Sequence, residues 1–309
     1  MCSPNPSASS IAPMLGVVNL DKPVGPTSHD MVGLMRRLTG TRRIGHAGTL
    51  DPLASGVLPI LVGAATRFSE ELTGGRKRYD ALIRLGARSA TDDAEGPIEA
   101  GDGPIPDEDA VRRELATFVG TFDQVPPAFS ARKQGGRTAH RAARAGAPID
   151  LPPRSVTIDA IELLEFTHDG GEATARIDLR CHAGTYVRSL ARDVGDRLGC
   201  GGYLAALRRT EAAGLHAGDA VTPERLEELA NAGRLAHAVM PVGELLPMPR
   251  ISLDAASVRA FANGSASHVG PGVDDGRRAV FDGDELLGIG SVSAGMLQPE
   301  KVLPRAEAP

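Results

Sequence analysis

The chain has 309 residues, and 34 Lys or Arg against 39 Asp or Glu give it a net charge of −5. Hydrophobic residues make up 41% and charged residues 24%, which excludes a fully disordered or fibrous protein, and this length is typical of about two domains. No apolar stretch approaches about 18 residues, so no membrane span is expected. The Ser- and Pro-rich start, Met1 to Met14, lacks the features of a secretory signal and is expected to be a disordered tail. We expect a cytoplasmic protein with reduced cysteines.

The first part of the chain is expected to place regular structure around a glycine-rich loop. Gly16 to Leu20 is an apolar run closed by Lys22-Pro23, which predicts a strand that ends in a turn. Ser28 is expected to cap a helix that Gly40 ends. The pattern then predicts a loop, an apolar run that is a buried strand or a helix start, and an alternating strand, at residues 45–56, 57–62 and 79–85.

Two neighbouring segments carry charge of opposite sign. Residues 92–109 hold eight acidic residues and no Lys or Arg, which is typical of a solvated loop. A helix is expected next, with Val111, Leu115 and Val119 on one side. Residues 124–148 contain no acidic residue, and we expect a mobile basic loop with a short Ala/Arg helix, whose cations are Arg132, Lys133, Arg137, Arg141 and Arg144.

The rest of the chain is expected to add strands, helices and a small β-rich unit. Strands are expected at Val156 to Phe166 and Ala173 to Cys181, and helices at 189–198 and after Thr222-Pro223. Beyond Pro247 and Pro249, a short helix and a hairpin are expected at 254–262 and 278–292. Because regular βαβ units are absent, the expected fold class is α+β with a mixed sheet. The expected divisions are a tail, a main domain and a small domain, at residues 1–14, 15–248 and 249–309.

Four short motifs could carry chemistry. Asp51 stands before a proline in the glycine-rich loop, where it could be a nucleophile, a base, a metal ligand or the side chain of an Asp-Pro turn. The other three are Gly184-Thr185-Tyr186-Val187-Arg188, Lys77-Arg78-Tyr79 and Leu207-Arg208-Arg209-Thr210. Taken singly, these could also be a water-facing arginine, an exposed strand tyrosine and a solvated basic turn. The sequence has no HExxH, GxxxxGK[ST], GxGxxG or GxSxG motif, and its cysteines lack zinc spacing, so neither metal nor cofactor is expected.

Four blocks in order resemble the TruB family of tRNA pseudouridine synthases. They span about Gly16 to Thr210 and read NLDKPVGPTSHD, GHAGTLDPLASGVLPI, KRYDALIRLG and GTYVRSLARDVGDRLGCGGYLAALRRT. The C-terminal LLGIGSV and LQPEKVLP are similar to the family's small PUA-like RNA-binding domain. The resemblance implies a largely antiparallel catalytic domain followed by this small domain. It also implies an isomerase that converts the uridine at position 55 in the T arm of tRNA without cofactor or metal.

The resemblance also implies roles for individual residues. Asp51 matches the catalytic aspartate, and His46 matches a histidine that contacts the RNA at the flipped nucleotide. Tyr79 matches the active-site tyrosine of its block. Tyr186 and Arg188 match the tyrosine and arginine of the GTYxR block, and Leu207 matches a leucine of the pocket wall. Transfer RNA is the expected partner of a protein that is monomeric by default, without an obligate protein partner or a membrane.

These residue types suit the reaction, which breaks the N1–C1′ bond and joins C5 to C1′. Asp51 could add to C1′ or C6, or could stabilise charge, and the sequence leaves these routes open. Arg188 is expected on an extended segment, on the same face as Tyr186 and paired with Asp51. The basic loop is expected to bind phosphates while residues 92–109 face away from RNA. Three alternatives stay open: a guide-dependent relative, a non-catalytic RNA-binding protein or tRNA-folding chaperone, and an unrelated hydrolase that uses Asp51.

Overall fold

The computed structural model describes residues 14–129, 133–134, 137–138, 149, 151–270 and 272–304. The expected tail before Met14 and the expected Ala/Arg helix lie outside the described residues. Of the basic insertion at 124–148, the model describes residues 124–129 and a two-stranded hairpin made of β8 (Lys133–Gln134) and β9 (Arg137–Thr138).

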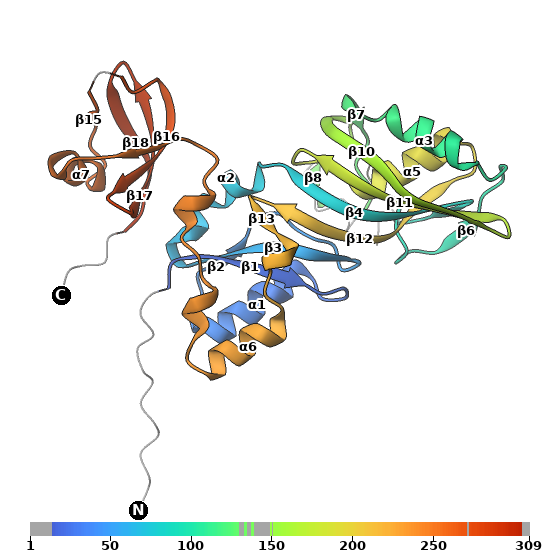
Figure 1. The fold of residues 1–309 in the computed structure, drawn as a ribbon, viewed down its shortest axis with the longest axis horizontal. Coiled ribbons are helices and arrows are strands. Elements are labelled where there is room, and N and C mark those ends of the chain that lie inside the picture. The colour runs from blue at the N-terminus through green and yellow to red at the C-terminus, as the bar shows by residue number, and fades with distance from the viewer. Residues whose placement is uncertain are drawn as a thin grey trace, which may run out of the picture.

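A mixed sheet of nine strands forms the larger part of the described chain (Figure 1). Its main path runs β1 (Gly16–Lys22), β3 (Ala54–Val62), β12 (Gly202–Ala212), β4 (Lys77–Leu85), β11 (Glu172–Cys181), β10 (Arg154–Asp169) and β7 (Gly120–Gln124). The short β2 (Ile44–His46) pairs with β3, and β13 (Leu215–His216) pairs with β12. Only β3 and β12 pair in parallel within this sheet. The prediction of an α+β fold with a largely antiparallel mixed sheet is confirmed.

The alternating sequence of the central strands determines which face is buried. In β4, Tyr79, Ala81, Ile83 and Leu85 are buried while the residues between them are partly exposed. In β11 the buried set is Ala173, Ala175, Ile177, Leu179 and Cys181. Successive side chains of a strand point to opposite faces, so these sets line one core, and both strand predictions are confirmed.

Four helices pack on this core: α1 (Ser28–Thr39), α3 (Glu108–Ala116), α5 (Val187–Arg197) and α6 (Pro223–Asn231). Three expected boundaries were wrong. The cap of α1 is Thr27, which forms a reciprocal capping box with Asp30. Val119 is exposed beyond the end of α3, where Phe118 packs into the core instead. Helix α5 begins at Val187, so Arg188 lies in its first turn.

Shorter elements connect these parts. They are η1 (Gly63–Phe68), α2 (Ser69–Thr73), β5 (Ala87–Ser89), β6 (Ile98–Ala100), η2 (Ala217–Asp219), η3 (Leu235–Ala238) and η4 (Val242–Leu245). None of the helices in the described ranges is long and apolar enough to cross a membrane.

A second, five-stranded sheet lies at one end of the molecule, beyond α2 (Figure 1). Its order is β14 (Arg250–Ser252), β16 (Gly276–Asp282), β17 (Glu285–Ser293), β18 (Met296–Val302) and β15 (Ser267–His268), with α7 (Ala255–Ala262) packed on it. Val258, Phe261, Val280 and Leu297 are among the residues of its own core. The expected helix and hairpin are therefore confirmed, and the identification of this unit as PUA-like stays a prediction.

An ionic cluster joins this sheet to α2. Glu71 is only 4% exposed and accepts from Arg277 of β16 at 2.8 Å and from Lys301 of β18 at 2.9 Å. Arg277 also pairs with Glu300, and Lys301 with Glu70. One carboxylate of the main domain thus holds two cations of the C-terminal sheet.

Candidate active site

Asp51 lies on the loop between β2 and β3, and three anchors fix that loop. The Ser28 hydroxyl accepts from the Leu50 N–H and donates to the Leu50 carbonyl, each at 2.8 Å. The Ala54 N–H donates to the Asp51 carbonyl at 3.0 Å, which closes a turn directly after Asp51. The Gly25 N–H donates to the Pro52 carbonyl at 2.8 Å. The loop is therefore a defined backbone structure, shorter than the expected 45–56 because β2 and β3 occupy its ends.

Arg209 also anchors this loop, from the opposite side. Its guanidinium is buried and donates to the carbonyls of Val57 at 2.7 Å, Gly48 at 3.0 Å and Thr49 at 3.4 Å. Its neighbour Arg208 pairs with Asp21 at 2.7 Å. The reading of this motif as a solvated basic turn was therefore wrong, because Arg209 supports the loop that carries Asp51.

The Asp51 carboxylate meets Arg188 at 2.9 Å, so the expected pairing of these two motifs is present in the structure. Arg188 is 7% exposed and Asp51 is 42% exposed. The guanidinium therefore lies behind the carboxylate on the protein side, and solvent or a ligand can reach the carboxylate from the other side. Such a pair suits attack on an electrophilic carbon or stabilisation of developing positive charge.

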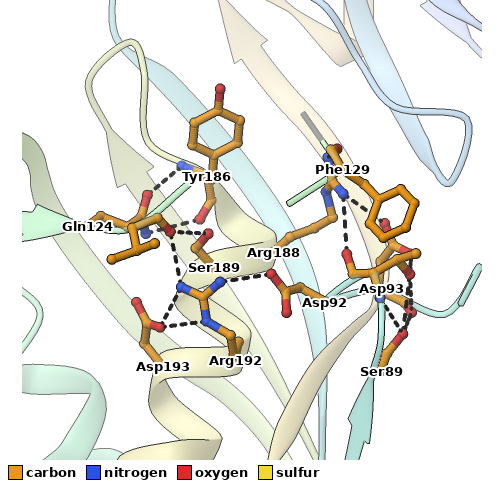
Figure 2. A network of polar contacts seen from close by, with 12 residues as sticks. Ser89, Asp92, Asp93, Gln124, Phe129, Tyr186, Arg188, Ser189, Arg192 and Asp193 are labelled. Atoms are coloured by element: carbon orange, nitrogen blue, oxygen red, sulfur yellow. Dashed lines mark hydrogen bonds and ion pairs between the residues drawn. The ribbon is translucent and has the colours of Figure 1, made fainter. Parts of the chain in front are cut away.

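Arg188 contacts three further groups, one of which, Asp93, belongs to the acidic segment at 92–109. Asp93 is 3% exposed and lies 3.4 Å from the guanidinium. The carbonyls of Thr91 and Phe129 accept at 3.2 and 3.0 Å (Figure 2). The expectation that residues 92–109 form a solvated loop facing away from the site was wrong for Asp92 and Asp93. A pattern of like charge cannot show which acids the fold turns inward.

Tyr186 is positioned through its backbone. Its N–H donates to Gln124 Oε1 at 2.9 Å, and its carbonyl accepts from Gln124 Nε2 at 3.1 Å. Figure 2 shows the Tyr186 ring projecting away from the polar contacts around Arg188. Tyr186 caps α5 and Arg188 is its second residue, so the two side chains do not share the face of an extended segment. That expectation was wrong, although both residues stand at the start of the same helix.

Tyr79 and His46 lie near this centre in environments that keep them uncharged. Burial raises the pKa of Tyr79, while the positive charge of Arg209 opposes the shift. Burial lowers the pKa of His46, and Arg209 lowers it further. The buried Nδ1 of His46 has no partner within the described chain. A neutral phenol and a neutral imidazole can therefore donate and accept hydrogen bonds near neutral pH.

Leu207 lies on β12 beside Ala54 of β3 and Ala81 of β4, where it is partly buried against the main core. Arg209, two residues further along β12, pairs in register with Tyr79. The fold thus brings the β3, β4 and β12 motifs to adjacent positions of one sheet. Arg188 reaches the same place from α5.

Sequence reasoning missed three residues that shape this region, Lys22, Asp93 and Gln124, and gave Arg209 no role of its own. Lys22 is buried, donates to the Pro23 carbonyl at 2.8 Å and lies 3.5 Å from the Pro52 carbonyl. Burial lowers its pKa to about 8, against the opposing effect of Asp51. The one available signal was that Lys22 and Arg209 fall inside the sequence blocks that resemble the TruB family.

The thiols are structural in character. Cys181 and Cys200 are buried and free, and burial raises the pKa of Cys181 to about 11. Across the described residues, no group of three or more His, Cys, Asp or Glu side chains could hold a metal ion.

Comparison with known proteins identifies the family. Residues 36–187 match the model of the TruB family pseudouridylate synthase N-terminal domain. Residues 188–247 match that of the tRNA pseudouridylate synthase B C-terminal domain. A tRNA pseudouridine synthase B of Burkholderia mallei (strain ATCC 23344) is 41% identical over 97% of both chains. One of Ralstonia pickettii (strain 12J) is 39% identical over 97% of this chain and 98% of the relative.

The solved structures agree with these matches. The fold is similar to a chain of "Crystal structure of the archaeal box H/ACA sRNP Nop10-Cbf5 complex", with a TM-score of 0.70, 28% identity, and coverage of 93% of this chain and 86% of that chain. The family models together cover more than half of the sequence, and the curated relatives exceed 30% identity over nearly its full length. This chain therefore belongs to the TruB family of pseudouridylate synthases.

Proposed function

We propose that this protein isomerises the uridine at position 55 in the T arm of tRNA to pseudouridine, with Asp51 as the catalytic carboxylate. Relatives that share about two fifths of its residues over almost the whole chain bear the name tRNA pseudouridine synthase B. The single observation that supports the site assignment is the 2.9 Å contact between Asp51 and Arg188. Two motifs far apart in sequence meet there around one accessible carboxylate.

The chemistry requires one carboxylate in a fixed place. The N1–C1′ bond breaks, the base turns, and C5 joins C1′; the proton on C5 then leaves and N1 gains one. Asp51 adds to C1′ or to C6, or stabilises charge as these bonds change. Arg188 fixes the carboxylate from behind, and the rigid loop leaves it little freedom to turn away.

The target base is buried in a folded RNA loop and must be flipped out to reach Asp51. Tyr79 and Tyr186 are proposed to stack on the flipped nucleotide or to place a hydroxyl beside it. Leu207 is proposed to line the pocket. The neutral ring of His46 is proposed to contact the RNA at the vacated position.

The rest of the chain is proposed to bind the T arm. The basic insertion at 124–148 supplies cations for RNA phosphates despite the net charge of −5. The C-terminal sheet, from about residue 249, is proposed to be a PUA-like RNA-binding domain. The enzyme is proposed to act as a monomer, without a guide RNA or protein partner, in the cytoplasm with its substrate.

The test compares wild type, Asp51→Asn and a matched control, Asp80→Asn, on an unmodified tRNA transcript. Asp80 lies next to Tyr79 on β4, pairs with Arg176 at 2.6 Å, and projects from the opposite face of the strand to Tyr79. Pseudouridine is mapped by carbodiimide adduct formation and primer extension, and RNA binding by filter retention. We expect modification at position 55 for wild type and Asp80→Asn, and none for Asp51→Asn with binding retained.

Two of the alternatives give results of their own. A wild type that binds tRNA without modifying it would contradict the proposal, and restoration of activity by a guide RNA would favour a guide-dependent enzyme. An Asp51→Asn variant that modifies tRNA at the wild-type rate would refute the assignment of the carboxylate.

A further inference from the structure

A left-handed turn carries Asp93, the buried acid that contacts Arg188. Asp92 has φ 62°, a backbone region that residues with a Cβ rarely adopt. The turn is tied to β12, because the Leu204 N–H donates to the Asp92 carbonyl and the Ala94 N–H donates to the Leu204 carbonyl, each at 3.0 Å. Since Asp92 and Asp93 are consecutive, the conformation at Asp92 determines where the Asp93 side chain points.

Two arginines, one helical turn apart on α5, hold this pair of acids. Arg188 contacts Asp93, and Arg192 contacts the Asp92 carboxylate at 2.9 Å (Figure 2). Residues four apart lie on the same face of a helix, so consecutive turns of α5 grip consecutive residues of the turn. Both members of the second pair are largely buried in the fold.

Arg192 has two additional partners, one of which connects it to the chain directly after β7, beside Tyr186. It pairs with Asp193 at 2.8 Å and donates to the Val125 carbonyl at 3.0 Å. The Ser189 hydroxyl donates to the same carbonyl at 2.9 Å. Val125 directly follows Gln124, whose amide holds the Tyr186 backbone. One guanidinium therefore spans the Asp93 turn, helix α5 and the segment that holds Tyr186 (Figure 2).

We propose that Arg192 and Asp92 are a pair of positioning residues that sets the place of Asp93 against Arg188, and through Arg188 the place of the Asp51 carboxylate. The pair acts on the reaction step without contacting RNA. The inference rests on the proposed function. It adds two residues to which the motif resemblance assigns no role.

The experiment measures single-turnover modification of a T-arm transcript at saturating enzyme, together with the Kd and the melting temperature. Variants are Arg192→Ala, Asp92→Asn and the double variant; Asn keeps the shape of Asp92 and tolerates φ > 0 but carries no charge. The matched control is Arg197→Ala on the same helix, which removes a contact to Glu114 and a ring contact to Phe118.

We expect Arg192→Ala to lower the saturated rate about tenfold to a hundredfold, since small misplacements of reacting groups have effects of this size. Its Kd should change less than about twofold, and the double variant should be no slower than the slower single one, because both remove the same contact. Arg192→Lys should restore part of the rate. Arg197→Ala should lower the melting temperature and leave the rate unchanged.

Three results would overturn the inference: a saturated rate equal to wild type in Arg192→Ala, a weaker Kd with an unchanged rate, or additive losses in the double variant. The second would make Arg192 an RNA-binding residue. Wild-type activity on the same transcript separates these outcomes from a failure of the proposed function, which would leave every form of the protein inactive.

Discussion

Replacing Arg188 tests the centre of the site most directly. Arg188 forms ion pairs with two carboxylates and donates to two carbonyls from an almost closed environment. Asp51→Asn removes the reacting group itself, whereas Arg188→Ala leaves it in place and removes the group that holds it. The two changes therefore separate chemistry from positioning.

The magnitude follows from the exposure of the partners. Removing one partner of a buried ion pair costs about 3–5 kcal/mol, and 42% exposure of Asp51 lets water replace part of its contact with Arg188. We expect Arg188→Ala to raise the barrier by about 2 kcal/mol, or about thirtyfold in rate. Arg188→Lys keeps the charge but loses the planar fork that reaches several acceptors, so a loss of about tenfold is expected.

The assay is single-turnover formation of pseudouridine in a T-arm transcript, with melting temperatures measured in parallel. Arg84→Ala is the matched control, since Arg84 of β4 pairs with Glu172 of β11 in an exposed position. Buried Asp93 keeps its bonds to Thr91 Oγ1 and the Glu95 N–H, so the variants should stay folded. Folded Arg188→Ala and Arg188→Lys with wild-type rates would refute the reasoning. A loss confined to Arg188→Ala would show that charge alone suffices.

Three further outcomes follow from other parts of the structure. Burial lowers the pKa of Lys77 to about 8 from 10.5, so the unfolded chain binds more protons between these pH values, and the free energy of unfolding should rise with pH there by up to about 3 kcal/mol. In Lys77→Met, the free energy of unfolding measured with urea should rise less steeply with pH. An equally steep rise would contradict the burial argument. Glu71→Gln should leave Arg277 and Lys301 without their shared carboxylate and lower the free energy of unfolding by about 1–3 kcal/mol. Proteolysis of the chain between the two sheets should become faster. Unchanged proteolysis would mean that the ionic cluster is not needed to hold the two sheets together. At Gly56 (φ 100°) a Cβ would lie 2.2 Å from the Arg209 carbonyl oxygen, whereas a Cβ at Gly25 would meet nothing within 4 Å. Gly56→Ala should therefore unfold at a much lower denaturant concentration than Gly25→Ala. Equal unfolding midpoints would show that the loop can shift.

Local pattern was sufficient for much of the fold. The period-two alternation of Tyr79 to Leu85 and Ala173 to Cys181 marks the buried face of each strand, because side chains of a strand alternate between two faces. Thr222-Pro223 marked the start of α6 through a cap and a preset φ. The blocks around Asp51, Tyr79 and Arg188 indicated the family, since their residue types and order are specific when taken together.

Long-range contacts decided the rest. Two adjacent acids in a run of eight turn inward because Arg188 and Arg192 of α5 face them, and nothing local distinguishes Asp92 and Asp93 from their exposed neighbours. The sequence around Arg209 is typical of a surface cation. The parallel pairing of β3 and β12 instead places its side chain under the loop of Asp51. Helix α5 begins two residues earlier than expected, so Arg188 projects from a helix instead of an extended segment. Its expected contact with Asp51 is nevertheless present. Sequence thus determined which side chains could react, whereas strand pairing and helix phase determined which of them meet, because those contacts join residues that are distant along the chain.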